Sequence, residues 1–192
     1  MILTISLASP MHAVEAGLVA GINGAPTVTR AGMTQPLKRG DAVDVGDRLT
    51  TDANAKLKIL LADDSVLNIG PQTEVVVDEL LLGDNRTGKL RVLAGRFKLA
   101  IAAWFGGSSD YQIDIPTAVA GVRGTVLWGD TTLDAICALQ GTVEVRAVKG
   151  SASATLNAGQ CVTKMAAGET APLTPSREDL LRYLKDVQLD PS

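Results

Sequence analysis

The chain has 192 residues, of which 46% are hydrophobic and 20% charged, so it can fold as one domain with its own core and is not a disordered chain. The formal net charge is −3 and no basic run is longer than two residues, which excludes an evident nucleic-acid-binding patch. Trp, Tyr and Phe each occur only twice, which argues against a surface that stacks sugar rings or bases.

The first 16 residues resemble the end of a signal peptide. A short apolar run over residues 2–8 is followed by small residues at Ala13 and Ala16, which are candidate cleavage sites. The run lacks a positively charged start, and a loose N-terminal tail is the alternative. On the apolar run and the small residues, we expect a periplasmic or secreted protein. No later segment approaches the roughly 18 uncharged apolar residues of a membrane helix, so we expect no integral membrane span.

Residues 17–165 have one texture, in which short apolar runs alternate with clusters of Gly, Asp, Asn and Thr. This pattern predicts an all-β domain of short strands. An apolar residue followed three positions later by glycine recurs along it, as at Val43/Gly46 and Val92/Gly95, at intervals of about twenty residues. That spacing fits the coils of a β-solenoid or the hairpins of a β-sandwich, and the glycine corners favour the solenoid-like arrangement.

The least regular piece of this domain is residues 102–109, where Trp104 and Phe105 stand beside a Gly-Ser loop. Two adjacent rings there could form an exposed hydrophobic lip, or they could cover the end of the core. If the protein binds a small ligand, these two rings and Trp128 are the natural candidates for lining the site.

Two apolar β-type segments meet at Gly121-Val122-Arg123-Gly124-Thr125. Arg123 lies in an apolar neighbourhood, so we expect its guanidinium to tie together strand-end carbonyls or a carboxylate such as Asp114. The alternative is that Arg123 anchors a carboxylate of a partner. Gly121 and Gly124 are expected to supply backbone freedom, and Thr125 a capping hydroxyl.

Residues for catalysis or metal binding are scarce. The single histidine, His12, lies in the predicted signal region, and neither Cys137 nor Cys161 has a plausible histidine partner. The two cysteines fit no zinc pattern; they could form a disulfide in an exported protein, or remain two buried thiols. Asp63 and Asp64 lie at a turn without the spaced oxygen ligands of a calcium site, and we interpret them as a solvated turn. We therefore expect no catalytic residues, no metal and no cofactor, and not an enzyme.

The texture changes after Met165. Residues 166–175 are rich in Pro, Gly and Thr and read as a linker. Residues 176–189 are predicted to form an amphipathic helix, because Ser176 is a good N-cap and Leu180, Leu181, Leu184 and Val187 have helical spacing. A helix of about three turns is unstable alone, so it should dock on its own domain or on a partner.

Six segments in order are similar to those of FecR domain proteins. They are Val45-Gly46-Asp47-Arg48-Leu49-Thr50-Thr51, Leu60-Leu61-Ala62-Asp63-Asp64-Ser65-Val66-Leu67, Leu93-Ala94-Gly95-Arg96-Phe97, Ile115-Pro116-Thr117-Ala118 with Val122-Arg123-Gly124-Thr125, Leu139-Gln140-Gly141-Thr142-Val143-Glu144-Val145, and Leu156-Asn157-Ala158-Gly159-Gln160. In the second segment, Asp64 stands where the family usually has glycine. The resemblance covers roughly residues 24–164.

The resemblance implies an extracytoplasmic, mostly β domain of the kind found in regulators that pass a signal from an outer-membrane receptor to a cytoplasmic sigma factor. The sequence shows neither the N-terminal cytoplasmic helices nor the membrane span of those regulators, so we expect a stand-alone FecR-like domain. Our first hypothesis is a non-enzymatic module that binds another envelope or secreted protein in signalling, with strand addition at an exposed sheet edge as one mode. The alternative is a ligand- or glycan-binding module. The oligomeric state stays open.

Overall fold

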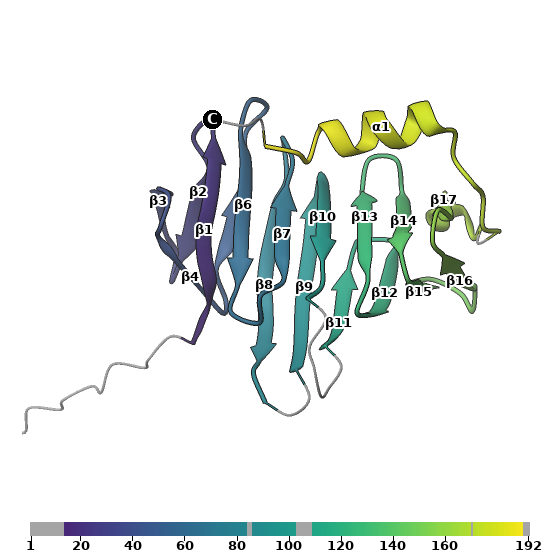
Figure 1. The fold of residues 1–192 in the computed structure, drawn as a ribbon, viewed down its shortest axis with the longest axis horizontal. Helices are drawn as coiled ribbons and strands as arrows, with labels where there is room; N and C mark the ends of the chain where they lie inside the picture. The colour runs from purple at the N-terminus through teal and green to yellow at the C-terminus, as the bar shows by residue number, and fades with distance from the viewer. Residues whose placement is uncertain (1–13, 84–85, 103–108, 170, 190–192) are drawn as a thin grey trace, which may run out of the picture.

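The computed structural model describes residues 14–83, 86–102, 109–169 and 171–189. Two sheets lie face to face, with the strands running across the long axis of the molecule (Figure 1). The eight-stranded sheet has the order β17 (Cys161–Thr163), β14 (Ala135–Gln140), β13 (Val126–Asp130), β10 (Arg96–Ala100), β7 (Val66–Ile69), β6 (Lys56–Leu61), β1 (Glu15–Asn23) and β4 (Ala42–Asp44).

The nine-stranded sheet has the order β16 (Ser153–Asn157), β15 (Thr142–Ala147), β12 (Ala118–Arg123), β11 (Ser109–Asp114), β9 (Arg86–Ala94), β8 (Glu74–Leu81), β5 (Arg48–Thr50), β2 (Thr27–Arg30) and β3 (Met33–Pro36). A short 3₁₀ turn (Met165–Ala167) and the helix α1 (Arg177–Lys185) follow the strands. The prediction of an all-β domain with one C-terminal α-helix is confirmed.

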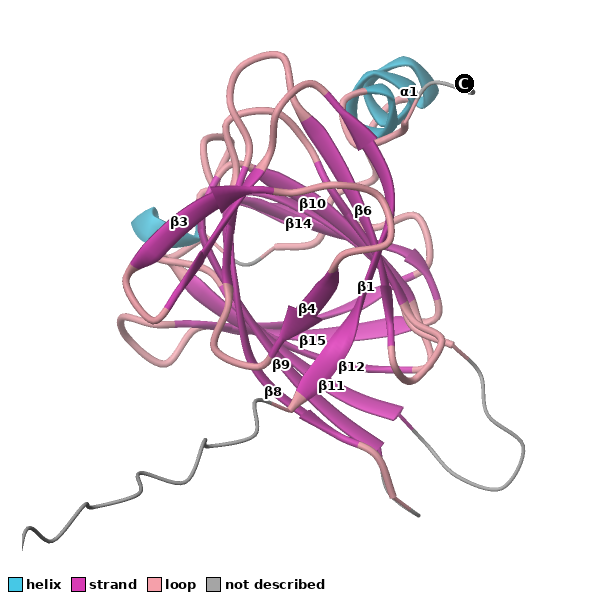
Figure 2. Ribbon diagram, turned by 90° about the vertical axis from the view of Figure 1, so that its left-hand side faces the viewer, coloured by secondary structure: helices cyan, strands magenta, loops and turns pink. Residues whose placement is uncertain are grey.

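The chain fills the two sheets alternately. From β6 onward the chain changes sheet after each hairpin or single strand, in the order β6–β7, β8–β9, β10, β11–β12, β13–β14 and β15–β16, so it advances along the long axis as it winds. Seen along that axis, the two sheets enclose a single core (Figure 2). The structure therefore combines the alternatives that the sequence left open, with two stacked sheets as in a sandwich and progressive winding as in a solenoid.

Strand alternation builds the core. In β6, for example, Leu57, Ile59 and Leu61 are buried between the sheets, whereas Lys56 and Lys58 point outward. Neighbouring strands are antiparallel except for the described pair β9–β11, which is parallel because β10 crosses to the other sheet between them.

Buried carboxylates hold the turns at both sheets. Asp47 accepts hydrogen bonds from Nε and Nη2 of Arg30 at 2.8 and 2.6 Å, and this bond raises the pKa of the guanidinium. Asp63 accepts from the Ser65 hydroxyl at 2.9 Å and from the Tyr111 hydroxyl at 2.8 Å, which joins a turn of the eight-stranded sheet to the nine-stranded one. Burial, and then the charge of Asp63, raise the pKa of the Tyr111 phenol, so the phenol keeps its proton and donates.

The interpretation of Asp63 and Asp64 as a solvated turn is wrong for Asp63, whose side chain is fully buried. Asp64 is exposed and has φ 70°, the left-handed conformation that glycine adopts most easily. The glycine that the resemblance to FecR domain proteins implies at this position would adopt the conformation without strain.

Gly95 tests how strongly one corner depends on glycine. It has φ 87°, and a Cβ there would lie 2.2 Å from Thr73 Oγ1 and 2.5 Å from the carbonyl oxygen of Gln72. Gly46 has nearly the same φ, 92°, but a Cβ would meet nothing within 4 Å. We expect Gly46→Ala to cost about 1–3 kcal/mol of unfolding free energy from the backbone alone, and Gly95→Ala to cost about 1–3 kcal/mol more from overpacking. Urea unfolding of both variants measures this, and equal losses would contradict it.

Candidate protein-interaction face

Arg123 lies on the outer face of the nine-stranded sheet and not in the core. Its side chain is 72% exposed, and its Nε and Nη2 donate to the two carboxylate oxygens of Asp110 on the neighbouring strand, at 2.6 and 3.0 Å. The hydrogen bond and then the charge of Asp110 raise the pKa of the guanidinium. Asp114, the partner we expected, instead lies 3.4 Å from Lys89 Nζ. The prediction of a buried clamp at Arg123 is therefore wrong.

The structural work of this corner is done by its neighbours. Thr125 is buried, and its hydroxyl donates to the carbonyl oxygen of Gln140 at 2.9 Å. Gly124 has φ 55°, and Val122 is buried in the core. Gly121 is different, because it lies within β12 without a positive φ and leaves a shallow open depression beside Arg123.

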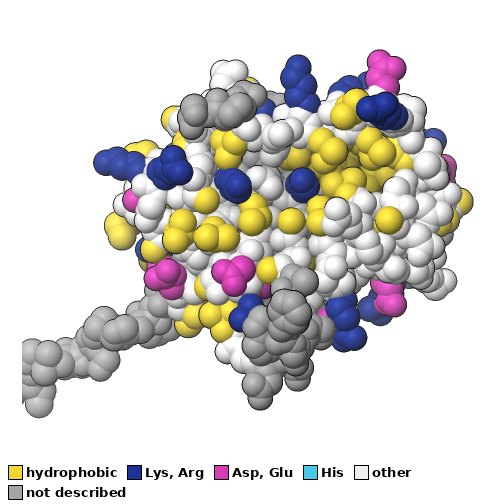
Figure 3. Space-filling view, in the orientation of Figure 1, with side chains coloured by type: hydrophobic (Ala, Val, Ile, Leu, Met, Phe, Trp, Pro, Cys, Tyr) yellow, Lys and Arg dark blue, Asp and Glu magenta, His cyan; other side chains and the backbone are white. Residues whose placement is uncertain are grey.

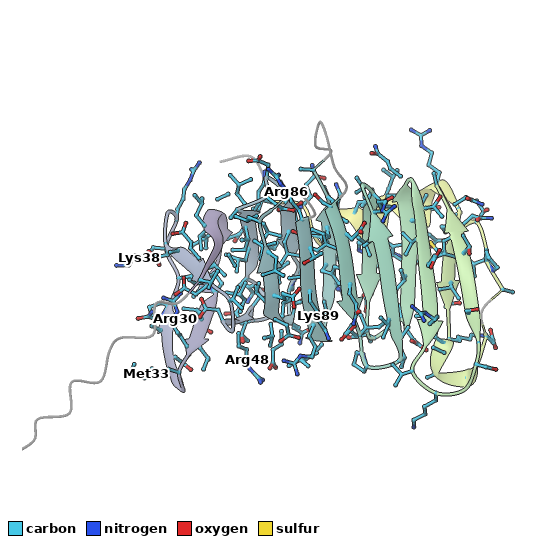
Figure 4. All side chains as sticks on the ribbon, turned by 90° about the horizontal axis from the view of Figure 1, so that it is seen from below. Arg30, Met33, Lys38, Arg48, Arg86 and Lys89 are labelled. Carbon is cyan, nitrogen blue, oxygen red and sulfur yellow. A yellow bond between two sulfur atoms is a disulfide. The ribbon has the colours of Figure 1, made fainter. Side chains whose placement is uncertain are left out.

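The outer face of the nine-stranded sheet carries four ion pairs, besides the exposed Glu144 and Arg146 of β15, which form none with the described residues. Figure 4 looks at the molecule from below and labels Arg48 and Lys89 on this side. The ion pairs are Arg48–Glu74, Lys89–Asp114, Arg91–Asp78 and Arg123–Asp110. Exposed pairs of this kind stabilise the fold little. They do give these eight side chains a partner, so a docking protein would gain little from them.

The outer face of the eight-stranded sheet is partly covered by α1, which crosses its strands (Figure 1). Tyr183 stacks on Trp128 with ring centroids 4.5 Å apart and ring planes 10° apart. Cys137 and Cys161 are joined by a disulfide on paired positions of β14 and β17, and they pack with Trp128 and Val187 in a small second core. Trp128 is thus 1% exposed and lines no open site, while Trp104 and Phe105 lie outside the described residues.

Few contacts hold α1 in place. The Ser176 hydroxyl caps its N-terminus by accepting from the Asp179 N–H at 3.1 Å. At the other end, Lys56 Nζ donates to the carbonyl oxygens of Lys185 and Gln188 at 3.0 and 2.9 Å, and Arg96 pairs with Asp186. No residue of the described helix is itself buried. α1 is therefore a light cover over one part of the face.

An uncovered row of apolar side chains crosses the rest of this face. Its members occupy successive paired positions and point away from the core: Ala42, Leu18, Leu60, Val66, Ala100 and Val126. We call this set the apolar row. Figure 3 shows it as a band of hydrophobic side chains with basic side chains above it. Ala42, Leu18 and Leu60 are exposed, and Val66, Ala100 and Val126 are half-buried.

The flanks of the apolar row differ in charge. On the α1 side, Lys58, Asn68 and Lys98 occupy successive paired positions. On the other side lie Glu15, at the start of β1, and Asp64, in the β6–β7 turn. None of these four charged side chains has an ion-pair partner within the described part of the chain. The face is thus apolar in the middle, basic on one side and acidic on the other.

The sheet edges are less suited to strand addition than we expected. β3 ends in Pro36, which cannot donate, and the Asp44 N–H of β4 is bonded to Asp47. Cys161 of β17 exchanges both backbone hydrogen bonds with Leu173. In β16, Gln160 takes the N–H and the carbonyl oxygen of Asn157, so alternation leaves only the backbone of Ser153 and Thr155 facing outward.

Sequence reasoning missed the apolar row. One local signal was available, because β6 reads Lys-Leu-Lys-Ile-Leu-Leu and its alternation breaks at Leu60, an apolar residue at an outward position. The row as a whole depends on the register of six strands, which one sequence does not reveal.

Comparison with known proteins gives both a family and a fold. A family model described as FecR protein matches residues 47–153, more than half of the chain. Two crystal structures of a "putative anti-sigma factor" from Parabacteroides distasonis superpose with TM-scores of 0.56 and 0.55 at 13% identity, covering 71% of this chain. The superposed regions cover 64% and 63% of the two crystallised chains, so this chain spans less than two thirds of their length. At this identity the likeness concerns the fold alone.

Two further searches gave a negative result. No curated protein matches the chain significantly. In the residues that the structure describes, no helix is long and apolar enough to cross a bilayer.

The seating of α1 can be tested through Trp128. In a Trp104→Phe background, Trp128 is the remaining tryptophan. We expect Tyr183→Ala to shift its fluorescence to longer wavelength and to cost about 1–2 kcal/mol of unfolding free energy, because the indole loses its stacked ring. Tyr183→Phe keeps the ring and serves as the matched control. Unchanged emission in Tyr183→Ala would mean that α1 does not cover Trp128.

Proposed function

Because the chain belongs to the FecR protein family, we propose that it is a non-enzymatic module that binds another envelope or secreted protein through the outer face of its eight-stranded sheet. Family membership supports a role in the regulation of envelope signalling. The observation that carries the choice of surface is the apolar row, an uncovered apolar band beside charges that have no partner of their own.

The opposite face is the less suitable surface. Eight of its charged side chains already form ion pairs, so docking over them would have to replace contacts that exist, whereas the exposed Glu144 and Arg146 of β15 form no ion pair with the described residues. Arg123 belongs to that face, and as a partner anchor it would first have to leave Asp110. We keep Arg123 as the second candidate, because its side chain is exposed and the depression beside Gly121 is open.

The buried acids do not suggest catalysis. The carboxylate oxygens of Asp47 accept from Arg30, and those of Asp63 accept from Ser65 and Tyr111. These hydrogen bonds are structural contacts inside the fold. Among the described residues, no group of three or more His, Cys, Asp or Glu could hold a metal ion. A regulatory role needs neither a cofactor nor a catalytic group.

We place the protein outside the cytoplasm, in the periplasm or beyond the cell. A disulfide such as that between Cys137 and Cys161 forms and persists in an oxidising compartment. The residues before Val14 lie outside the described part, but the fold limits where a signal peptide can be removed. Ala16 is fully buried in β1, and the carbonyl oxygen of Val14 accepts from the Val45 N–H at 2.8 Å. Cleavage after Ala13 keeps both, whereas cleavage after Ala16 removes a core residue.

The binding face is tested by cross-linking in cells that make a tagged protein. We expect Leu60→Asp to lower the yield of the cross-linked partner at least about tenfold, since it places a charge in the apolar row. Arg123→Ala, on the opposite face, should leave that yield unchanged. The reverse result would move the interaction to the Arg123 corner. Recovery of no partner by any variant or by the parent protein would refute the proposed function.

Processing is tested by the intact mass of the exported protein. We expect a mature chain that begins at Val14, because that terminus preserves β1 and its bond to Val45. A mature chain that begins at Gly17 would contradict this, and a chain that keeps residue 1 would contradict export through signal cleavage. The variant Ala13→Asp, which spoils the small residue at the site, should accumulate unprocessed protein.

A further inference from the structure

We propose that the apolar row seats an amphipathic helix of the partner protein, which lies alongside α1 and presents carboxylates to Lys58 and Lys98. This inference rests on the proposed function of the same face and specifies the partner element that the face fits. Three features of the face support it: the face already packs one helix, the row has the length of a helix, and its two sides carry opposite charges.

α1 is the internal precedent. It lies across the strands of this sheet and packs Tyr183 on an outward aromatic residue, Trp128. Near its end, Asp186 pairs with Arg96, an outward basic residue of β10. The outer face therefore already holds one helix by an apolar contact and by an acid on the helix meeting a base on the sheet. The apolar row and the two lysines offer the same pair of contacts next to it.

The dimensions fit a second helix. The row crosses six strands, from Ala42 to Val126, and at about 4.8 Å between strands it extends about 24 Å. A helix of about 16 residues has this length at 1.5 Å per residue. Lys98 pairs directly with Trp128, and Ala100 lies two residues further along β10, about 7 Å away. Helices packed side by side have axes about 8–10 Å apart, so the row lies at a suitable distance from α1.

The charges set the orientation of the helix about its axis. Lys58 and Lys98 lie two strands apart, about 9.6 Å, on either side of Asn68. Residues seven apart on a helix are separated by about 10.5 Å along its axis, so Asp or Glu at such positions would meet both lysines. The opposite flank faces Glu15 and Asp64 and favours basic residues there. The expected partner helix is thus acidic along the side next to α1.

Two other occupants remain as outcomes to be tested. An extended segment could lie across the strands in place of a helix. A second copy of this chain could also supply its own α1, since that helix carries Glu178 and Asp179 in its first turn. Both would place residues on the same row, so the experiment has to read the conformation and the identity of the bound segment.

The experiment uses a photoreactive amino acid placed at Leu60 or at Val126 of the full chain in living cells. These positions are three strands apart, about 14 Å. In a helix their cross-links should fall about 10 residues apart in the partner, and in an extended strand only about 4 apart. Mass spectrometry of the cross-linked peptides measures the separation. The same probe at Thr155, on the β16 edge, and at Thr142, on the opposite face, serves as the control.

The role of the two lysines is tested by the variants Lys58→Glu and Lys98→Glu. We expect the double variant to lower the cross-link yield from position 60 at least tenfold, whereas Lys149→Glu, on the exposed β15–β16 turn, leaves it unchanged. Charge reversal of the acidic residues found in the partner helix should restore the yield.

The results separate the two levels of the argument. Cross-links about 4 residues apart, cross-links to a second copy of the chain, a partner segment without acidic residues, or cross-links from Thr155 alone would each overturn the helix proposal and leave a protein-binding module. No protein cross-linked from any of the positions would overturn the proposed function itself.

Discussion

The two-residue alternation of β-strands is the constraint on which the rest of this structure depends. Each strand gives one set of side chains to the core between the sheets and the other set to an outer face. The core needs only the inner set, as in β10, where Phe97 and Leu99 are buried. Apolar residues on an outer face are therefore surplus to the fold. Most charges on that face of the nine-stranded sheet are paired, whereas the eight-stranded sheet carries Trp128, which α1 covers, and the apolar row, which nothing described covers.

How far the sequence predicts this structure depends on the distance over which residues must be compared. Alternation within single strands and glycine at the corners suffice for the all-β class, and Ser176 suffices to start the helix. The wrong prediction that Arg123 is buried is a local error, and it has a physical cause. β12 reads Ala-Val-Ala-Gly-Val-Arg, so both of its faces look apolar and only its position in the sheet decides which one turns inward. The apolar row could not be predicted because it depends on long-range pairing, since its members are spread from residue 18 to residue 126.

Buried polar groups explain why some motif residues are fixed without being functional. Asp47 and Asp63 lie in turns that have to be buried when the second sheet closes over them, and each is tolerated because several donors converge on it. Removing one donor would leave a buried carboxylate short of a partner, which costs more than the lost bond itself. The segments that identify the family are thus largely those that build its corners. Specificity for a partner has to come from outward side chains, whether they lie outside these segments, as Leu18 does, or within them, as Leu60 and Val66 do.

A face that is half covered by its own helix suits a regulator. α1 is tethered to the domain by a short linker, so its few contacts suffice to keep it seated at a high effective concentration. A helix of another protein that makes similar contacts on the neighbouring row lacks this advantage. Its contacts alone have to offset the entropy that is lost on association. Such a complex would be reversible, and its stability would depend on the length of the partner helix and on its charges toward Lys58 and Lys98. Contact with the side of α1 would add to this stability. The short intramolecular helix would then act as one wall of the binding site as well as a cover for Trp128.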